Sequence, residues 1–301
     1  MIPLRTALML SGLMILPGSC IAASSESTPR GPEQSTIVAK PIAPPAPIRI
    51  GAFELNRAPQ QGGLSFGVVP AGTKRLAIDG RDVDFAADRR FVVGFGRDYA
   101  ATATISAFLS NGETITERLP VSPTRWIVEN LSRLPHHVQP DAEFKARRPA
   151  ELAQINAARH RTSDTEGWRQ TFIWPVLGRI SGAFGSQRIY AGQPGAPHGG
   201  VDIAGITGTP VVAPADGVVI LAAASPFTLE GNLLMIDHGM GLNSAFLHLS
   251  RIDAKLGDHV RRGQTVGAIG MTGRATGPHL HWGMKWHDER IDPATLPPNN
   301  R

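Results

Sequence analysis

The chain has 301 residues, enough for one large domain or two smaller ones, and a formal net charge of +5. Its cationic side chains form no run interleaved with aromatic residues, and only two residues are tyrosine, which argues against nucleic-acid binding. Beyond the N-terminus no segment approaches about 18 uninterrupted apolar residues, which argues against a transmembrane helix.

The N-terminus has the pattern of a secretory signal peptide over residues 1–23. A short positive start that ends at Arg5 precedes an apolar stretch, and the small residues Ala22 and Ala23 offer the cleavage position. We therefore expect an exported protein of the periplasm or cell envelope. Its positive charge is compatible with two interpretations: ordinary surface charge that keeps the protein soluble, which we favour, or attraction to anionic envelope polymers.

Cys20, the only cysteine, leaves an alternative open. Gly18-Ser19 before it would suit a lipoprotein attachment site, whereas Pro17 fits that pattern poorly. We expect the cysteine to be removed with the signal peptide. The mature protein then has no disulfide, and its stability must come from hydrophobic cores.

A linker and a small accessory β domain follow. Residues 24–47 are rich in serine and proline, a composition that cannot bury a core. Within residues 48–130, apolar and polar side chains alternate along 102–109, as in a half-buried strand. Asp79-Gly80 and Asn111-Gly112 each stand between strand-like segments and predict two hairpins.

Residues 141–161 have a helical pattern and are predicted to connect two domains. Phe144, Leu152, Ile155 and Ala158 fall on one apolar stripe. Because Pro149 would interrupt a helix, we expect the regular part over residues 150–161.

Residues 168–296 are predicted to form a second, larger β domain. Glycine is frequent there, and apolar segments such as 233–239 and 263–270 end at glycine turns. This spacing favours an antiparallel β barrel or sandwich. The predicted fold class of the whole chain is therefore mainly β.

Three short segments of this second domain predict a zinc site with acid–base partners. Zinc in hydrolases is usually held by three protein ligands, His or carboxylate, with a fourth position left for water. His198 and Asp202, joined by a glycine turn, could supply two of these ligands. One member of the pair His279 and His281, which share one face of a strand, could supply the third.

The remaining histidines must then move the protons, because no H-E-x-x-H helix offers a glutamate as the base. The candidates are His248 and the non-ligating member of the pair His279 and His281. A neutral imidazole near a cation should have a lowered pKa and stay basic at neutral pH. His238, at a strand–turn junction, is expected to be structural.

Residues 168–296 resemble the lysostaphin/LytM-type zinc metallopeptidases, which cut peptidoglycan cross-bridges. The matching segments are His198-Gly-Gly-Val-Asp202, Phe246-Leu-His248-Leu-Ser250 and Thr272-Gly-Arg-Ala-Thr-Gly-Pro-His-Leu-His281-Trp-Gly283. The resemblance implies a duplicated hybrid motif fold whose β-sheet groove takes an extended peptide. Residues 48–130 loosely resemble the accessory region of exported Gram-negative members.

The resemblance also implies a role for each site residue. His198, Asp202 and His281 would bind Zn²⁺, His248 and His279 would be catalytic, and Tyr190 would stabilise the reaction intermediate. The natural substrate would be peptidoglycan, cleaved at a D-alanyl–diaminopimelate cross-link if the cell is Gram-negative.

Two other classes of function compete with this interpretation. A LytM-like regulator that has lost its ligands would activate cell-wall amidases or bind peptidoglycan together with a protein partner, but the ligand set here is complete. A biotinyl or lipoyl carrier would need an exposed lysine on a hairpin tip. The segments that resemble carrier repeats, 213–217 and 257–263, contain no lysine.

Overall fold

The computed structural model describes residues 47–131, 142–190 and 192–296, and their regular structure is mostly β. The predicted signal peptide, Cys20 and all of the predicted linker except residue 47 lie outside these residues. Residues 45–301 form one compact unit. Among the described residues, no helix is both long enough and apolar enough to cross a membrane.

The N-terminal part of this unit contains two four-stranded antiparallel sheets. The first has the order β1-β2-β3-β6 and the second the order β5-β4-β7-β8. The strands of the first sheet are β1 (Ile48–Ile50), β2 (Phe53–Leu55), β3 (Leu64–Val68) and β6 (Arg90–Gly94). The strands of the second are β5 (Arg81–Val83), β4 (Thr73–Ile78), β7 (Thr102–Leu109) and β8 (Thr114–Pro120).

Local turn chemistry sets the second sheet. Ile78 pairs with Arg81, so Asp79 and Gly80 form a two-residue turn, with φ angles of 48° and 80°. Two positive φ angles are what a type I′ hairpin requires. Asn111-Gly112 likewise lies between β7 and β8. Both predicted hairpins and the predicted strand over 102–109 are confirmed.

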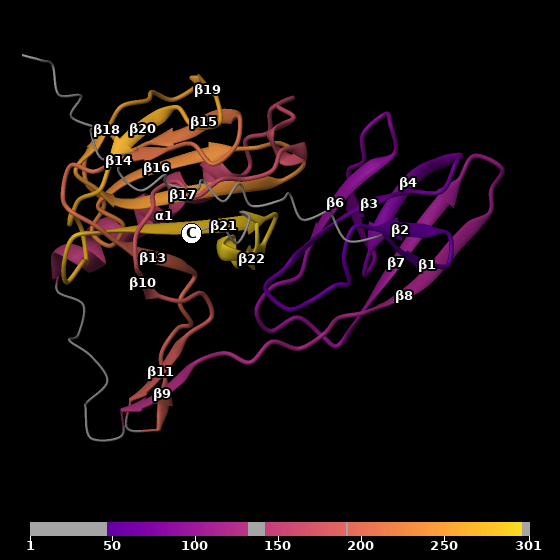
Figure 1. Ribbon diagram of the computed structural model, residues 1–301, viewed down its shortest axis with the longest axis horizontal. Helices are drawn as coiled ribbons and strands as arrows, with labels where there is room; N and C mark the ends of the chain where they lie inside the picture. The colour runs from indigo at the N-terminus through magenta and orange to yellow at the C-terminus, as the bar shows by residue number, and fades with distance from the viewer. Residues whose placement is uncertain (1–46, 132–141, 191, 297–301) are drawn as a thin grey trace, which may run out of the picture. The chain divides into compact units, whose positions relative to one another are not determined.

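The C-terminal part is built on an eight-stranded antiparallel sheet. Its order is β10-β13-β21-β17-β16-β15-β19, with β22 paired to β21, and Figure 1 shows the central strands side by side. These strands are β10 (Ile180–Gly182), β13 (Gly200–Ala204), β21 (His279–Trp286), β17 (Leu242–Leu249), β16 (Asn232–Asp237), β15 (Gly217–Ala222), β19 (His259–Val260) and β22 (Glu289–Ile291).

Two smaller sheets and two short 3₁₀ helices complete the described structure. One sheet is antiparallel, with β14 (Pro210–Val212), β20 (Thr265–Ala268) and β18 (Arg251–Ile252). The other has β12 (Gln193–Pro194), β11 (Gln187–Tyr190) and β9 (Val128–Leu131), and β11 runs parallel to β9. The 3₁₀ helices are η1 (Gly167–Arg169) and η2 (Pro293–Thr295). The mainly β, antiparallel class is confirmed, and the open large sheet fits a sandwich.

The two faces of the large sheet have different environments. Leu280, Trp282 and Met284 of β21 point into the main hydrophobic core. Because strand side chains alternate, His279 and His281 point to the opposite face, and Lys285 follows on that same face. We call this opposite face the groove face.

Helix α1 (Ala142–Arg159) covers part of the groove face. Its buried Ile155 and Ala158 pack with Leu233 and Met235 of β16. The helix begins before the regular part expected from residue 150 and continues through Pro149. A proline removes one backbone hydrogen bond from a helix. The two residues before it bind other parts of the fold, Arg147 the carbonyl of Pro226 and Arg148 the side chain of Glu230.

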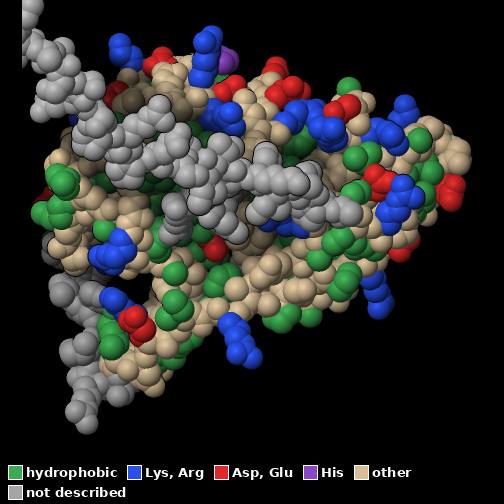
Figure 2. Space-filling model, in the orientation of Figure 1, with side chains coloured by type: hydrophobic (Ala, Val, Ile, Leu, Met, Phe, Trp, Pro, Cys, Tyr) green, Lys and Arg blue, Asp and Glu red, His purple; other side chains and the backbone are tan. Residues whose placement is uncertain are grey.

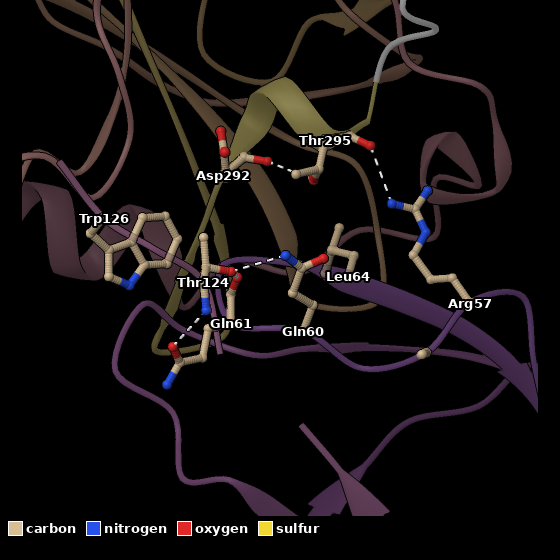
Figure 3. A pocket seen from close by; sticks show the side chains of 10 residues that line it. Arg57, Gln60, Gln61, Leu64, Thr124, Trp126, Asp292 and Thr295 are labelled. Carbon is tan, nitrogen blue, oxygen red and sulfur yellow. Dashed lines mark hydrogen bonds between the residues drawn. The ribbon is translucent and has the colours of Figure 1, made fainter. Parts of the chain in front are cut away.

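The N-terminal and C-terminal parts share one continuous hydrophobic core. The amide of Asp292 donates to the carbonyl of Gly62 at 2.7 Å, and Arg57 donates to the carbonyl of Thr295 at 3.3 Å. These contacts surround a small cavity of about 80 Å³ (Figure 3). The predicted boundary between two domains falls inside this packed unit and stays a prediction.

The surface charges are mixed. On the face shown in Figure 2, lysine and arginine side chains are interspersed with acidic ones and do not gather into one large patch. An anion recognised on that face would therefore have to bind a local cluster of cations.

Candidate active site

Strand register brings Asp202 and His281 together. β13 and β21 are antiparallel neighbours, and these two residues are register partners, so their side chains lie side by side on the groove face. His198 comes from the loop that leads into β13. Its amide donates to Ser186 and its carbonyl accepts from Gly185, which fixes the loop against the preceding turn.

One ligand atom of each of these residues converges on a single point. The distance from His198 Nε2 to Asp202 Oδ1 is 3.1 Å, and that from His198 Nε2 to His281 Nδ1 is 3.0 Å. His281 Nδ1 lies 2.9 Å from Asp202 Oδ1. Among the described residues, this is the cluster of His, Cys, Asp and Glu that could hold a metal ion.

The donor set fits zinc. The Nδ1–H of His198 donates to the carbonyl of Ala183 at 3.0 Å, so Nε2 presents a lone pair to the cluster. Two imidazole nitrogens and a carboxylate oxygen are typical ligands of catalytic zinc. Tetrahedral bonds of about 2.0–2.2 Å place ligand atoms about 3.3–3.6 Å apart, so the three ligand atoms would have to move apart by only a few tenths of an ångström.

The charges of the trio are interdependent. Burial alone would raise the pKa of Asp202, but its close contacts with the rings of His198 and His281 outweigh burial and hold the pKa well below its usual range. Burial opposes protonation of His198, yet contact with Asp202 leaves its pKa raised. Burial lowers the pKa of His281. The trio therefore holds a carboxylate anion that attracts a cation.

The two other predicted histidines lie next to this trio. The ring centroids of His248 and His279 are 4.8 Å apart, and His279 Nε2 is 3.7 Å from Asp202 Oδ1. Each ring donates its Nδ1–H to a backbone carbonyl, His248 to Thr272 at 2.9 Å and His279 to Gly277 at 2.8 Å. Both Nε2 atoms are thereby left as proton acceptors.

His248 has an unusual backbone conformation. Its φ angle is 64°, in the left-handed region, although it lies near the end of strand β17. Its amide donates to the carbonyl of Glu230 at 2.8 Å, which holds the conformation. Burial lowers the pKa of its ring to about 4, so His248 is neutral at pH 7. Side chains held in strained backbone positions often belong to functional sites.

Tyr190 lies at the end of β11, where its register partners are Gln193 on β12 and Leu131 on β9. A hydrogen bond with Tyr190 contributes to the raised pKa of Arg188. The structure thus places Tyr190 on the small sheet, and its expected role stays a prediction.

His238 is buried and structural, as expected from its place at a strand–turn junction. Its Nδ1–H donates to the carbonyl of Asp216 at 2.8 Å, and its Nε2 lies 2.8 Å from the hydroxyl of Ser244. Burial lowers its pKa to about 4. Both ring nitrogens are occupied, and His238 is not part of the metal cluster.

Sequence reasoning missed the residues that support the site from outside. Arg148 of α1 forms two hydrogen bonds, of 2.6 and 2.8 Å, with Glu230, whose carbonyl holds His248. Arg97 of the N-terminal part donates to the carbonyl of Gly185 at 2.8 Å, in the turn that holds His198. In a sequence, such arginines look like ordinary surface residues. Their role becomes visible only when the structure shows their partners, which are far away along the chain.

Comparison with known proteins agrees with this geometry. The family model described as "Peptidase family M23" matches residues 196–293. The chain is 45% identical over 105 residues to "Peptidoglycan DD-endopeptidase ShyA" and 41% identical over 128 residues to "Peptidoglycan DD-endopeptidase ShyB", both of Vibrio cholerae. These matches cover 35% and 42% of this chain and 24% and 26% of those proteins, so the chain spans about a quarter of their length.

A solved structure matches over most of the chain. A crystal structure from Pseudomonas aeruginosa, described as a peptidase M23, is 32% identical with a TM-score of 0.61. The match covers 80% of this chain and 95% of that one, and so includes much of the N-terminal part as well. The chain belongs to peptidase family M23.

Proposed function

We propose that this protein is a zinc-dependent endopeptidase that hydrolyses the peptide cross-links of peptidoglycan. The observation that carries the proposal is the convergence of two histidines and a carboxylate on one point, with two further histidines beside them on the same face of the sheet. Three metal ligands with acid–base side chains beside them are an arrangement that can support metal-assisted hydrolysis of a peptide bond.

In this proposal His198, Asp202 and His281 hold the zinc ion. Zinc, when bound, supplies a Lewis acid that lowers the pKa of a coordinated water and polarises the scissile carbonyl. The carbonyl of Ala183 orients His198, and the position of Asp202 opposite His281 on the neighbouring strand orients the other two ligands. The ligand geometry is therefore fixed mainly by backbone atoms.

His248 and His279 are proposed to move the protons. One Nε2 accepts the proton of the attacking water, and the pair then stabilises the developing negative charge and protonates the departing amine. The backbone bonds from both Nδ1 atoms orient the two rings toward the same space. Tyr190 is proposed to assist in stabilising the intermediate.

Peptidoglycan is proposed as the substrate on the strength of the relatives and the groove face. The curated relatives of Vibrio cholerae are named peptidoglycan DD-endopeptidases. A D-alanyl–diaminopimelate cross-link is the proposed bond. The predicted signal peptide supports action in the periplasm or cell envelope, either as a free protein or with a lipid on Cys20.

The competing role is that of an inactive regulator that activates cell-wall amidases or binds peptidoglycan. Such a protein needs no complete metal site, whereas the set of ligands and proton carriers is complete in this chain. A regulatory protein partner is also compatible with an active enzyme. The N-terminal part, residues 48–130, is where we propose that such a partner binds.

Digestion of purified peptidoglycan tests the proposed function. We expect the mature protein with zinc to convert cross-linked muropeptide dimers into monomers, as identified by mass spectrometry. His281→Ala, prepared in the same way, is the matched control and should leave the dimers intact. Intact dimers with the zinc-loaded wild-type protein would refute the endopeptidase and favour the regulator.

A further inference from the structure

One end of the groove face carries three cations that the proposed mechanism does not use. Lys285 lies on the same face of β21 as His281, and its register partner on β22 is Arg290. Arg159, the last residue of α1, is the third, and it is close enough for its charge to act on Lys285. We call these three residues the cation cluster. Within the described part of the chain, none of them forms a salt bridge, and the buried Nε of Arg159 has no hydrogen-bond partner.

The three charges act on one another. Burial lowers the pKa of Arg159, and the charge of Arg290 lowers it further. Burial also lowers the pKa of Lys285, and both arginines add to that effect. Asp288 and Glu289 act in the opposite direction without reversing the shift. Glu230 and Asp288 likewise oppose the shift of Arg159 without reversing it. The three side chains are therefore close enough for their charges to act on one another.

Glycines separate the cation cluster from the metal trio. Gly200 and Gly283 are register partners, and a Cβ on Gly200 would lie only 2.8 Å from Nε2 of His281. A Cβ on Gly199 would meet the side chain of Arg290 at 3.4 Å. The strand surface between His281 and Arg290 thus has no side chains at Gly199, Gly200 and Gly283. We call this surface the floor, and a peptide backbone can lie close to it.

His198 of the metal trio and Arg290 of the cation cluster line one cavity of about 380 Å³. Two carboxylates also line it. Asp98 is paired with Arg97 at 2.5 Å, and Glu289 lies against Gly96, on the side of β22 opposite to Arg290. Neither carboxylate forms a salt bridge with Arg290, which remains available to a ligand.

We propose that Arg290, Lys285 and Arg159 form a subsite that binds a free carboxylate of the peptide substrate. Lys285 lies four positions after His281 on β21, which corresponds to about 13 Å at about 3.3 Å per residue. A bound carboxylate would thus lie about four extended residues from the scissile bond. The guanidinium groups of two arginines can each form paired hydrogen bonds with a carboxylate, which favours this anion.

This proposal rests on the proposed function, since it names the chemical group by which the same groove recognises its peptide. Stem peptides of peptidoglycan carry free carboxylates on glutamate, diaminopimelate and terminal alanine residues. A substrate whose carboxylates have been amidated should therefore bind weakly. Hydrogen bonds to charged groups are strong enough for a difference of about tenfold or more in Kd.

Calorimetric titration of the zinc-loaded full chain with a tetrapeptide stem tests the subsite. This probe has no cross-link, so binding can be measured without cleavage. We expect wild-type protein to bind the free acid at least about tenfold more tightly than the fully amidated tetrapeptide. Lys285→Gln/Arg290→Gln should bind both forms alike. Arg261→Gln, at an exposed arginine, should keep the preference of the wild type.

The outcomes separate the subsite from the function. Equal binding of both forms by the wild type, or a preference that persists in the double variant, would overturn the subsite, since the carboxylate would then be bound elsewhere. Lys285→Arg/Arg290→Lys keeps both charges and should keep the preference, which controls for damage to the fold. Peptidoglycan digestion by the wild type is scored separately, and its failure would refute the endopeptidase and leave the binding result standing.

Discussion

The backbone amide of His248 donates to the carbonyl of Glu230, whose side chain is bound by Arg148 of α1. Glu230 thus connects a helix outside the sheet to a proposed catalytic residue with a left-handed backbone. The side chains of Arg148 and Glu230 are only 17% and 11% exposed, so their pairing has little competition from water.

Replacing Arg148 by methionine should impair both stability and turnover. Loss of one partner leaves Glu230 largely buried and unpaired, and we expect unfolding to become easier by about 3 kcal/mol or less, because the pair keeps some exposure. The carbonyl of Glu230 would then shift and no longer hold His248 in place, so kcat should fall with little change in zinc content. Urea unfolding and cleavage kinetics measure these effects. Lys145→Met, an exposed position on the same helix, is the control. A normal kcat in Arg148→Met would show that the helix does not position His248.

His281→Ala should lose most of the bound zinc. Two ligands, His198 and Asp202, would remain, and catalytic zinc sites normally use three protein ligands. Elemental analysis after dialysis should find about one zinc ion per chain in the wild type and only a small fraction of that content in the variant. Full occupancy in the variant would remove His281 from the ligand set.

His248→Ala and His279→Ala should keep the zinc and lose activity. Neither ring belongs to the converging trio, and both present Nε2 to the proposed reaction space. Loss of one proton-transfer group typically lowers the rate by about 10²–10⁴-fold. Zinc content and cleavage rate should be measured on the same samples. If His279→Ala released zinc as readily as His281→Ala, the roles within this pair would have to be exchanged.

Arg97→Met should weaken zinc binding from a distance. Arg97 donates to Gly185 at 2.8 Å and to Gln187 at 3.2 Å, and this turn supplies the carbonyl that orients His198. Loss of outer support around a metal ligand typically costs about 10–100-fold in metal affinity or activity. Competition with a chelator measures the Kd for zinc. Arg75→Met, at an exposed arginine of β4, should leave it unchanged. Equal zinc affinity of Arg97→Met and wild type would mean that the N-terminal part does not stabilise the metal site.

The buried His238 should make stability depend on pH. Its pKa is about 4 in the folded protein, against about 6.5 when unfolded, so protons bind the unfolded state more strongly between these values. The stabilisation is present above about pH 6.5 and is lost as the pH falls towards 4, by about 3 kcal/mol in total. Urea unfolding of metal-depleted wild type and His238→Gln across this range should show a shallower slope for the variant. Parallel slopes would assign the pH dependence to other groups.

Much of the fold and site followed from short-range patterns. Asp79-Gly80 needs only its own positive φ angles to form a hairpin, and His279 and His281 share a face because strand side chains alternate. Features that depend on residues far apart in the chain could not be predicted from such patterns. The helix continues through Pro149, and the carbonyls of Ala183 and Thr272 orient two histidines although any residue could supply such an atom.

Helix α1 limits the path that a substrate can follow. Leu247 lies opposite His281 and packs with the residues beneath the helix, so the surface beyond β17 is already occupied by the protein's own side chains. We therefore expect a bound peptide to lie along β13 and β21 rather than beyond β17. A peptide held in an extended conformation should accordingly bind more tightly than a cyclic peptide of the same sequence that is forced to turn back on itself.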